Sequence, residues 1–277
     1  MTLTTLLSAP ATIVYILAAM ALLAFLETLI PLHSRGRWNR AHIGPNLALT
    51  FLTFATNALY GAGVVLVLNA LEPRGVGLLH LLPLPAPMSV LVVVLGLDFS
   101  FYVAHVSMHH AAPLWRFHKV HHSDPAVDVT TTIRQHPGEG VIRYAFMGAG
   151  VVILGASPAA FAIYRAWAAL NGLLEHANIR MPRRLDSLLS LVVTTPNMHK
   201  VHHSRTATET DTNYGNIFSL FDRLFSTFTP SERGLSIAYG LDGTDEPATQ
   251  TTAGLLALPF RHAKKFAEPV GAVPRAS

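Results

Sequence analysis

Cysteine is absent from the 277 residues of this chain, and charged side chains are scarce. Without cysteine the chain can form no disulfide, no thiolate-ligated iron–sulfur cluster or haem, and no cysteine nucleophile. Only 13% of the residues are Asp, Glu, Lys or Arg, and the mean hydropathy is +0.38. A soluble domain carries about 25% charged residues. The composition therefore predicts a membrane protein, in which any metal is bound through nitrogen or oxygen.

Long apolar runs account for the high hydropathy. Residues 11–32 contain one charged group, Glu27, residues 47–71 contain none, and residues 81–104 contain only Asp98. Each run is long enough to cross roughly 30 Å of hydrocarbon at about 1.5 Å per residue. No basic segment precedes the first run, so we expect it to be retained and not cleaved as a signal peptide. These runs predict an all-α, integral membrane helical protein.

Two shorter apolar runs follow, at residues 141–156 and 158–174. They predict either a shallow hydrophobic hairpin or two buried helices of a folded core. We accordingly divide the chain into N-terminal transmembrane helices (1–104), a histidine-rich catalytic region (105–241) that includes the hairpin (141–174), and a C-terminal tail (242–277). The tail is rich in Thr, Ala, Pro and Gly. We expect about the last ten residues to be poorly ordered, as chain termini often are.

The basic residues predict the orientation in the membrane. Arg35, Arg37 and Arg40 lie between the first two runs, whereas Arg74 is the one arginine between the second and third. The positive-inside rule then places the first loop in the cytoplasm, the amino terminus outside, and the histidine-rich region on the cytoplasmic side of a multi-pass protein. The pI is near 9.6 but the formal net charge is only +4, so juxtamembrane arginine explains the basic character and no nucleic acid is expected as a partner.

Histidine is concentrated in the middle of the chain, where eleven of the fifteen fall between residues 105 and 203. They include one His-x3-His pair and two His-x2-His-His boxes. Residues four apart share one face of a helix, so each motif can bind one metal ion. Each box can also bridge toward a second metal ion. Neutral imidazoles at this density would leave ring nitrogens without partners, and protonated ones would repel, so a bound cation is expected. The candidate catalytic and metal-binding residues of the three motifs are His105, His109, His118, His121, His122, His199, His202 and His203.

The number of imidazoles favours two metal ions. A zinc site is usually satisfied by three or four protein ligands, whereas the three motifs offer eight. Imidazole suits iron, copper, nickel and zinc alike, so the ligand type alone leaves the metal open.

The order and spacing of the boxes are similar to those of the fatty acid hydroxylase and sterol desaturase superfamily. The resemblance covers roughly residues 98–228 and includes the strings Trp115-Arg116-Phe117-His118 and Asn213-Tyr214-Gly215-Asn216. It implies a di-iron centre of two Fe ions that uses O2 and two external electrons to hydroxylate or desaturate a lipid-like apolar substrate.

The same resemblance implies that His176 is a further ligand. Relatives with a His-x3-His pair at this point carry a second histidine four residues earlier, but this chain has Gly172 there. One ligand position is then filled from elsewhere or by water. His136 is a candidate for it, because Arg134-Gln135-His136-Pro137-Gly138-Glu139 is similar to strings in related hydroxylases.

Carboxylates near the boxes are candidate partners for metal-bound imidazoles, which usually donate their second N–H to such a group. Asp98 lies seven residues before His105, Asp124 follows the second box and Glu175 adjoins His176. Asp124 and Glu175 have the alternative of facing water at a helix end. We expect His110 to be an outer or interfacial group. The histidines expected to take no part are His33, His42, His80 and His262.

The electrons must come from a partner, since no dinucleotide fingerprint, haem motif or iron–sulfur motif is visible. A reductase with a carrier of the cytochrome b5 or ferredoxin type is expected. A membrane metal transporter or metal-buffering protein is one alternative, although the boxes follow the spans and do not lie at the bilayer midplane. A zinc-dependent membrane hydrolase is another, and it would leave most of the imidazoles unexplained. Hydroxylation is preferred over desaturation because it needs one hydrogen abstraction, while sterols, fatty acyl lipids, aminolipids and carotenoids all stay open as substrates.

Overall fold

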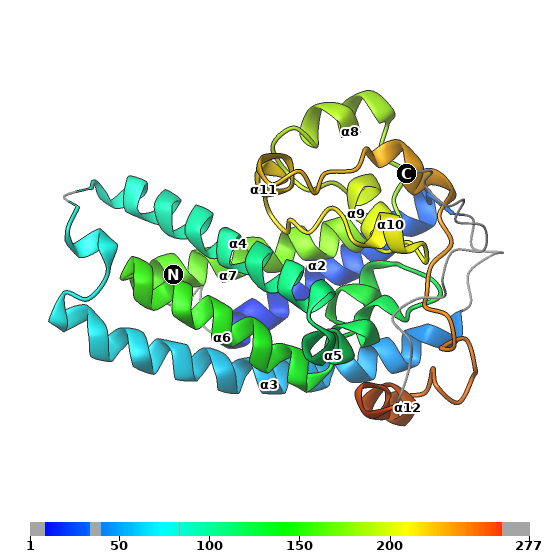
Figure 1. The fold of residues 1–277 in the computed structure, drawn as a ribbon, viewed down its shortest axis with the longest axis horizontal. Coiled ribbons are helices and arrows are strands. Elements are labelled where there is room, and N and C mark those ends of the chain that lie inside the picture. Colours follow the sequence, from blue (N-terminus) through cyan, green and yellow to red (C-terminus); the bar gives the residue numbers. More distant parts are fainter. Residues whose placement is uncertain (1–8, 34–39, 83, 262–277) are drawn as a thin grey trace, which may run out of the picture.

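The computed structural model describes residues 9–33, 40–82 and 84–261 (Figure 1). Across these ranges the chain is helical, with two isolated β-bridges and no sheet, which confirms the predicted all-α fold. Residues 262–277, the end of the tail predicted to be poorly ordered, lie outside the described residues. The long helices run along the long axis of Figure 1 and are α2 (Ala9–Leu29), α3 (Ile43–Leu71), α4 (Ala86–His110), α6 (Pro137–Leu154) and α7 (Pro158–His176).

Shorter helices gather at one end of this bundle, on the right of Figure 1. They are α5 (Ala112–His122), α8 (Arg183–Leu189), α9 (Pro196–His202), α10 (Ala207–Thr210), α11 (Leu220–Leu224) and α12 (Thr252–Ala257). The 3-10 helices in the same part of the chain order are η2 (Arg40–His42) before α3, η5 (Val129–Ile133) after α5, η6 (Ser231–Ser236) before α12 and η7 (Leu258–Phe260) after it. At the opposite end, η3 (Glu72–Arg74) and η4 (Leu78–His80) join α3 to α4.

Three helical segments are long and apolar enough to cross a membrane: Ala11–Leu29, Ile43–His80 and Ala86–His110. They correspond to the three predicted runs. The third continues past residue 104, so that His105 and His109 lie in the last turns of this candidate membrane helix. Pro113, in the first turn of α5, starts a new helix directly afterwards.

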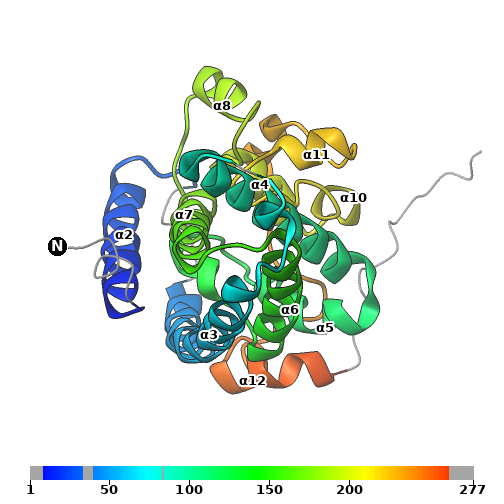
Figure 2. The ribbon, with the colours of Figure 1, turned by 90° about the vertical axis from the view of Figure 1, so that its left-hand side faces the viewer.

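Helices α6 and α7 form the predicted hairpin, which turns at Gly155. This residue has a φ of +68°, and a Cβ built on it would lie 2.5 Å from the carbonyl oxygen of Val76, so the turn requires glycine. The hairpin also contributes to the main core, where α4, α6 and α7 meet. Buried side chains that these three helices contribute to the core include Val93, Leu97, Met147, Val151, Phe161 and Tyr164. In the end-on view of Figure 2, α2 lies at the edge of the bundle beside α7.

Proline and a capping residue fix where three site helices begin. Helices α6, α7 and α9 each have proline at the first position, where the missing N–H is not needed. The preceding side chains of His136, Ser157 and Thr195 each accept a hydrogen bond from a backbone N–H of the first turn. The register of the histidines on α9 therefore follows from local sequence.

The ends of the long helices meet at the end of the bundle that holds the short helices. Glu27, near the end of α2, accepts hydrogen bonds from the backbone N–H groups of Val129 and Asn178, both at 2.8 Å. His42, just before α3, contacts Asp124. This end therefore collects the ends of α2, α4 and α7 and the beginnings of α3 and α6 (Figure 1).

A buried polar network attaches the start of α3 to the segment after α5. The Asp124 carboxylate accepts hydrogen bonds from His42 Nδ1 at 2.9 Å, Asn46 Nδ2 at 2.7 Å and Thr131 Oγ1 at 2.8 Å. Burial raises the pKa of Asp124, but the charges of Arg134 and His42 outweigh it and hold this pKa well below its usual range. Burial lowers the pKa of His42, but the Asp124 carboxylate outweighs it, so this pKa lies above its ordinary value.

We expect this network to make stability fall as the pH rises. A folded-state pKa above the unfolded value of about 6.5 means that the stabilisation is complete below that value and is lost as the pH rises through the folded pKa. His42→Gln should lower the free energy of unfolding by about 1–3 kcal/mol at about pH 6 and flatten the pH dependence. Thermal unfolding in detergent at about pH 6 and about pH 9 measures both effects. An identical slope in the variant would show that His42 carries no charge in the fold.

Candidate metal centre

Nine buried histidines converge at this end of the bundle in two neighbouring groups. Within each group, the atoms that could bind a metal all lie within 4.8 Å of one another. The first group consists of His105, His109, His118, His122 and His202. The second consists of His121, His176, His199 and His203. The structure thus brings together all eight histidines of the three motifs, together with His176.

Each His-x2-His-His box is divided between the two groups. On α5, His118 and His122 belong to the first group, whereas His121 belongs to the second. On α9 the assignment is reversed: its two outer histidines belong to the second group and His202 belongs to the first. Adjacent residues on a helix point about 100° apart, so the last two histidines of a box diverge toward different centres. Facing boxes thereby join the two groups, and the rings of His122 and His203 lie 4.6 Å apart.

The imidazole spacing within each group fits a shared metal ion. In the first group, the Nε2 atoms of His105 and His122 lie 3.0 and 3.1 Å from Nε2 of His118. In the second group, three Nε2 atoms lie 3.0 to 3.1 Å from Nε2 of His176. Two nitrogens at right angles on one ion, with bonds of about 2.1 Å, lie about 3.0 Å apart. Both groups therefore have the geometry of a metal-binding set.

Unsatisfied ring nitrogens support the same conclusion. The Nε2 atoms of His109 and His202 are buried and have no hydrogen-bond partner, a costly situation that a bound cation would relieve. Burial and the neighbouring imidazoles hold the pKa of His121, His122 and His199 well below its ordinary value. Burial also lowers the pKa of His202 to about 3. These rings are therefore neutral near pH 7, the form that binds a metal.

Backbone carbonyl groups fix three of the rings from behind. The Nδ1 atoms of His105 and His202 lie 2.8 Å from the carbonyl oxygens of Tyr214 and Thr212, and Nδ1 of His176 lies 2.7 Å from that of Gly172. When the Nδ1–H of a ring donates to a carbonyl oxygen, its Nε2 carries the lone pair, and this lone pair faces the centre of the group.

Carboxylates lie beside two further rings, and the sequence did not identify them. Asp211 Oδ1 lies 3.0 Å from Nδ1 of His109, and Glu139 Oε1 lies 3.1 Å from Nδ1 of His118. Glu139 belongs to the same string that suggested His136. Its place in the first turn of α6 is the feature by which the sequence could have identified it. Asp211 lies 102 residues after its histidine, and no local pattern pointed to it.

Two expected carboxylate partners have other roles. Asp98 accepts hydrogen bonds from the backbone N–H groups of Ile217 and Phe218 at 3.2 and 3.0 Å, so it anchors that loop and contacts no imidazole of the two groups. Asp124 serves the buried network with His42 and neither binds a metal-site histidine nor faces water. Glu175, the third candidate, does lie at the second group, 3.8 Å from Nε2 of His199.

The other histidines of the described ranges lie outside both groups. His136 caps α6, where its Nδ1 accepts a hydrogen bond from Gly138 N at 2.9 Å, and its ring lies 5.2 Å from that of Phe117. His110 Nε2 contacts the Tyr214 hydroxyl at 3.2 Å. The remaining ones are His33, His42 and His80, while His262 falls outside the described residues.

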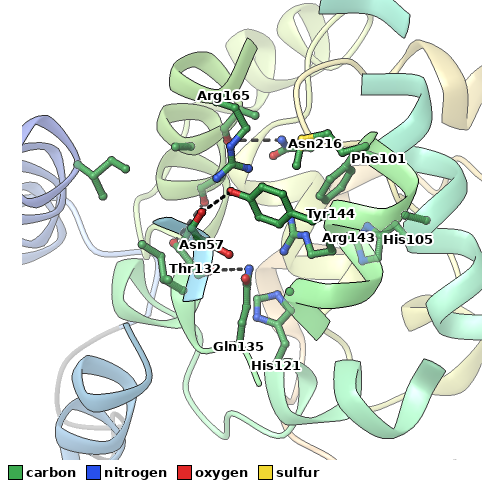
Figure 3. Close-up of a pocket in the computed structure, with 18 of the residues that line it drawn as sticks. Asn57, Phe101, His105, His121, Thr132, Gln135, Arg143, Tyr144, Arg165 and Asn216 are labelled. Carbon is green, nitrogen blue, oxygen red and sulfur yellow. Dashed lines mark hydrogen bonds between the residues drawn. The ribbon is translucent and has the colours of Figure 1, made fainter. Parts of the chain in front are cut away.

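A cavity of about 240 Å³ opens beside the histidines (Figure 3). Its walls come mainly from α2, α3, α4, α6 and α7, with contributions from α5, η5 and α9, and they are largely apolar. Members of the two histidine groups at its wall are His105, His118, His121, His176 and His199, and Glu175 lies beside them. The apolar side chains include Ile13, Ile16, Phe54, Phe101, Met108 and Met147.

Two arginines give the cavity a polar region. Arg143 pairs with Glu139 at 3.3 Å and lies over the Phe101 ring at 4.5 Å. Arg165 lies over the Tyr144 ring at 5.2 Å (Figure 3). Among the described residues, no hydrogen bond or ion pair is formed by the Arg165 guanidinium.

A helical bundle with three candidate membrane spans and two histidine groups that could hold metal ions is typical of metal-dependent membrane proteins, and comparison with known proteins narrows this class. Residues 90–227 match the fatty acid hydroxylase family. The chain is 30% identical over 239 residues to the ornithine lipid hydroxylase of Rhizobium tropici, covering 82% of this chain and 70% of that protein. It is 29% identical over 164 residues to the alkylglycerol monooxygenase of Caenorhabditis elegans, and 27% over 162 residues to that of Homo sapiens.

The last two matches each cover 58% of this chain but only 31% and 34% of the relative, so the chain spans about a third of those monooxygenases. No solved structure matches it. The chain belongs to the fatty acid hydroxylase family, which confirms the resemblance of its histidine boxes.

Proposed function

We propose that this protein is a membrane-bound di-iron oxygenase that hydroxylates a lipid-like substrate with O2 and two external electrons. The observation that carries the proposal is the pair of neighbouring, buried histidine groups at the wall of a largely apolar cavity. A transport site is expected near the bilayer midplane, whereas these groups lie where the spans end. A hydrolase with one zinc ion would use only one of the two groups. The relatives named hydroxylase and monooxygenase support the same reaction class.

Nine histidines would hold the two iron ions. Those of the first group are His105, His109, His118, His122 and His202, and those of the second are His121, His176, His199 and His203. When bound, the iron supplies the activation of O2 and the oxidation of an unactivated C–H bond. The chain itself orients imidazoles through contacts at their Nδ1 atoms and surrounds the reacting carbon with apolar walls. The electrons would come from a reductase with a cytochrome b5 or ferredoxin type carrier.

The cavity supports an amphiphilic substrate. Apolar side chains of α2, α3, α4 and α6 can accept an alkyl chain, and Arg143 and Arg165 offer donors to a polar group on the same molecule. An ionisable group within a membrane bundle is costly unless it is partnered or functional. Arg165 stacks over Tyr144 but has no hydrogen-bond or ion-pair partner among the described residues, so its N–H groups can bind a substrate oxygen.

We expect Arg165→Gln to raise the KM for the lipid substrate roughly tenfold or more, because a hydrogen bond to a charged group contributes about 1.5–3 kcal/mol. The kcat should change much less, since the metal centre is untouched. Steady-state kinetics in nanodiscs measures both values. Arg184→Gln, on the exposed surface of α8, is the matched control. An equal rise in both variants would remove Arg165 from the binding site.

Comparative lipid mass spectrometry of cells with and without this chain tests the reaction class. Hydroxylation adds one oxygen atom to a lipid, whereas desaturation removes two hydrogen atoms. A lipid that gains oxygen only when the chain is present supports the proposal. An unchanged lipid profile from cells that contain the iron-loaded protein would favour metal transport or buffering instead.

We also propose a multi-pass topology with the metal centre on the cytoplasmic side. The arginine-rich loop supports it, because His33 and His42, which flank this loop, lie at the same end of the bundle as the histidine groups. Since the chain has no cysteine, single exposed cysteines can report on each side without background. Ala112→Cys should be protected from an impermeant maleimide in intact cells, and Glu72→Cys should react. The opposite labelling would reverse the topology.

A further inference from the structure

The two histidine groups differ in the number of donors. The first contains five imidazoles and the second contains four. Four pairs of positions, each four residues apart, supply or border the two groups. Three of these pairs have histidine at both positions, as His118 and His122 do. The fourth pair, on α7, is Gly172 and His176. The second group is therefore the one with fewer imidazoles, and the position where a further imidazole would stand is Gly172, which has no side chain.

The Glu175 carboxylate lies next to this position. A Cβ built on Gly172 would lie 4.0 Å from Glu175 Oε1, so the carboxylate borders the space that a side chain at residue 172 would enter. The same oxygen lies 3.8 Å from Nε2 of His199. Two donors on one ion, with bonds of about 2.1 Å, lie between about 3.0 and about 4.2 Å apart. Glu175 Oε1 is thus within this range of His199, but it lies outside the four nitrogens that fall within 4.8 Å of one another, so binding the same ion requires its side chain to turn toward them.

The side of the ring that Glu175 faces distinguishes it from the other acidic residues. Glu139 and Asp211 approach Nδ1 atoms, which point away from the centre of the first group. Glu175 approaches Nε2 of His199, the nitrogen that faces the centre of the second group. Its 3.8 Å separation from Nδ1 of His176 is too long for a hydrogen bond.

The Glu175 carboxylate also lacks other partners. It is buried, and its Oε2 accepts no hydrogen bond. Among the described residues, no lysine or arginine nitrogen lies within 4.0 Å of it. A buried carboxylate without a cation or donor is strongly unfavourable, so the site calls for a positive charge at this point.

We propose that Glu175 is the fifth donor of the second group and binds the second metal ion directly through a carboxylate oxygen. This rests on the proposed di-iron centre. The two ions would then be chemically different: the first would have five nitrogen donors, and the second would have four nitrogens and one oxygen. Glu175 also lines the cavity, so the oxygen donor lies on the side of the centre where the substrate binds.

The test uses anaerobic loading of the full-length protein with ⁵⁷Fe²⁺, followed by chelator treatment, iron analysis and Mössbauer spectroscopy. The wild type should retain two ions and show two distinct quadrupole doublets. Glu175→Gln should retain the first ion and bind the second at least roughly 10–100-fold more weakly, since the loss of a mere outer partner already costs that much. Asp98→Asn, which alters a buried carboxylate bonded only to backbone N–H groups, should retain both ions.

A rescue variant separates ligand loss from misfolding. In Gly172→His/Glu175→Gln, an imidazole enters the space beside the second group, where the nearest atom to the new Cβ, Thr132 Cγ2, is 3.4 Å away. This variant should again retain two ions, with two doublets more alike than in the wild type. Wild-type affinity for both ions in Glu175→Gln would overturn the assignment of Glu175 and leave the di-iron proposal intact. A wild type that retains fewer than two ions would instead overturn the di-iron proposal itself.

Discussion

His202→Ala should remove iron from the first histidine group, and His121→Ala should remove it from the second. In each case the other two histidines of the same box belong to the opposite group. The reason is the division of each box between the groups: His202 on α9 faces the histidines of α4 and α5, and His121 on α5 faces those of α7 and α9. Loss of a direct ligand should cost more than the roughly 10–100-fold in metal affinity that loss of an outer partner costs, and turnover should fall below detection in both variants.

Mössbauer spectra of the two ⁵⁷Fe²⁺-loaded variants distinguish the positions. The doublet that disappears in His202→Ala should be the one retained in His121→Ala. His136→Ala is the matched control, because this histidine caps α6 outside both groups, and its effect on bound iron should be small. Loss of the same doublet in both variants would contradict the divided boxes, and an equal loss of iron in His136→Ala would make that residue a ligand.

Glu139→Gln should lower iron affinity or turnover roughly 10–100-fold, the usual effect of removing a carboxylate behind a metal-bound imidazole. The Glu139 carboxylate holds Nδ1 of His118 at 3.1 Å and pairs with Arg143 at 3.3 Å. The amide of glutamine keeps the shape but loses the negative charge that makes the imidazole a stronger donor. Iron titration with parallel circular dichroism measures binding and fold together. The same loss in Asp98→Asn, which has no contact with the imidazoles, would show a general effect of burial and not of ligand orientation.

The sequence predicted the parts of this protein that depend on local periodicity. The three spans follow from the length and hydropathy of their runs, and they agree with the three candidate membrane helices. The pairs four residues apart on α4, α5 and α9 follow from helical geometry, and the structure brings each pair to one group. His176 came from the family resemblance alone. The division of the chain into 1–104, 105–241 and 242–277 stays a prediction, and its first boundary falls inside α4.

Contacts that depend on tertiary packing could not be predicted in this way. Asp98 shares a helical face with His105, but seven residues separate the two by about 10 Å along the axis, too far for a contact. The carboxylates that do hold imidazoles, Glu139 and Asp211, come from α6 and from the segment after α10. The distribution of each box between two centres likewise requires the facing box, which only the folded chain provides.

Turnover under isotopically labelled dioxygen tests the central proposal most directly. The purified protein, loaded anaerobically with two Fe²⁺ ions in nanodiscs that contain the lipid identified in cells, would receive a reductant and then ¹⁸O2. A di-iron hydroxylase should form a lipid carrying one labelled oxygen atom, only when reductant, iron and lipid are all present. A product that carries unlabelled oxygen from water, or full activity with zinc in place of iron, would contradict it.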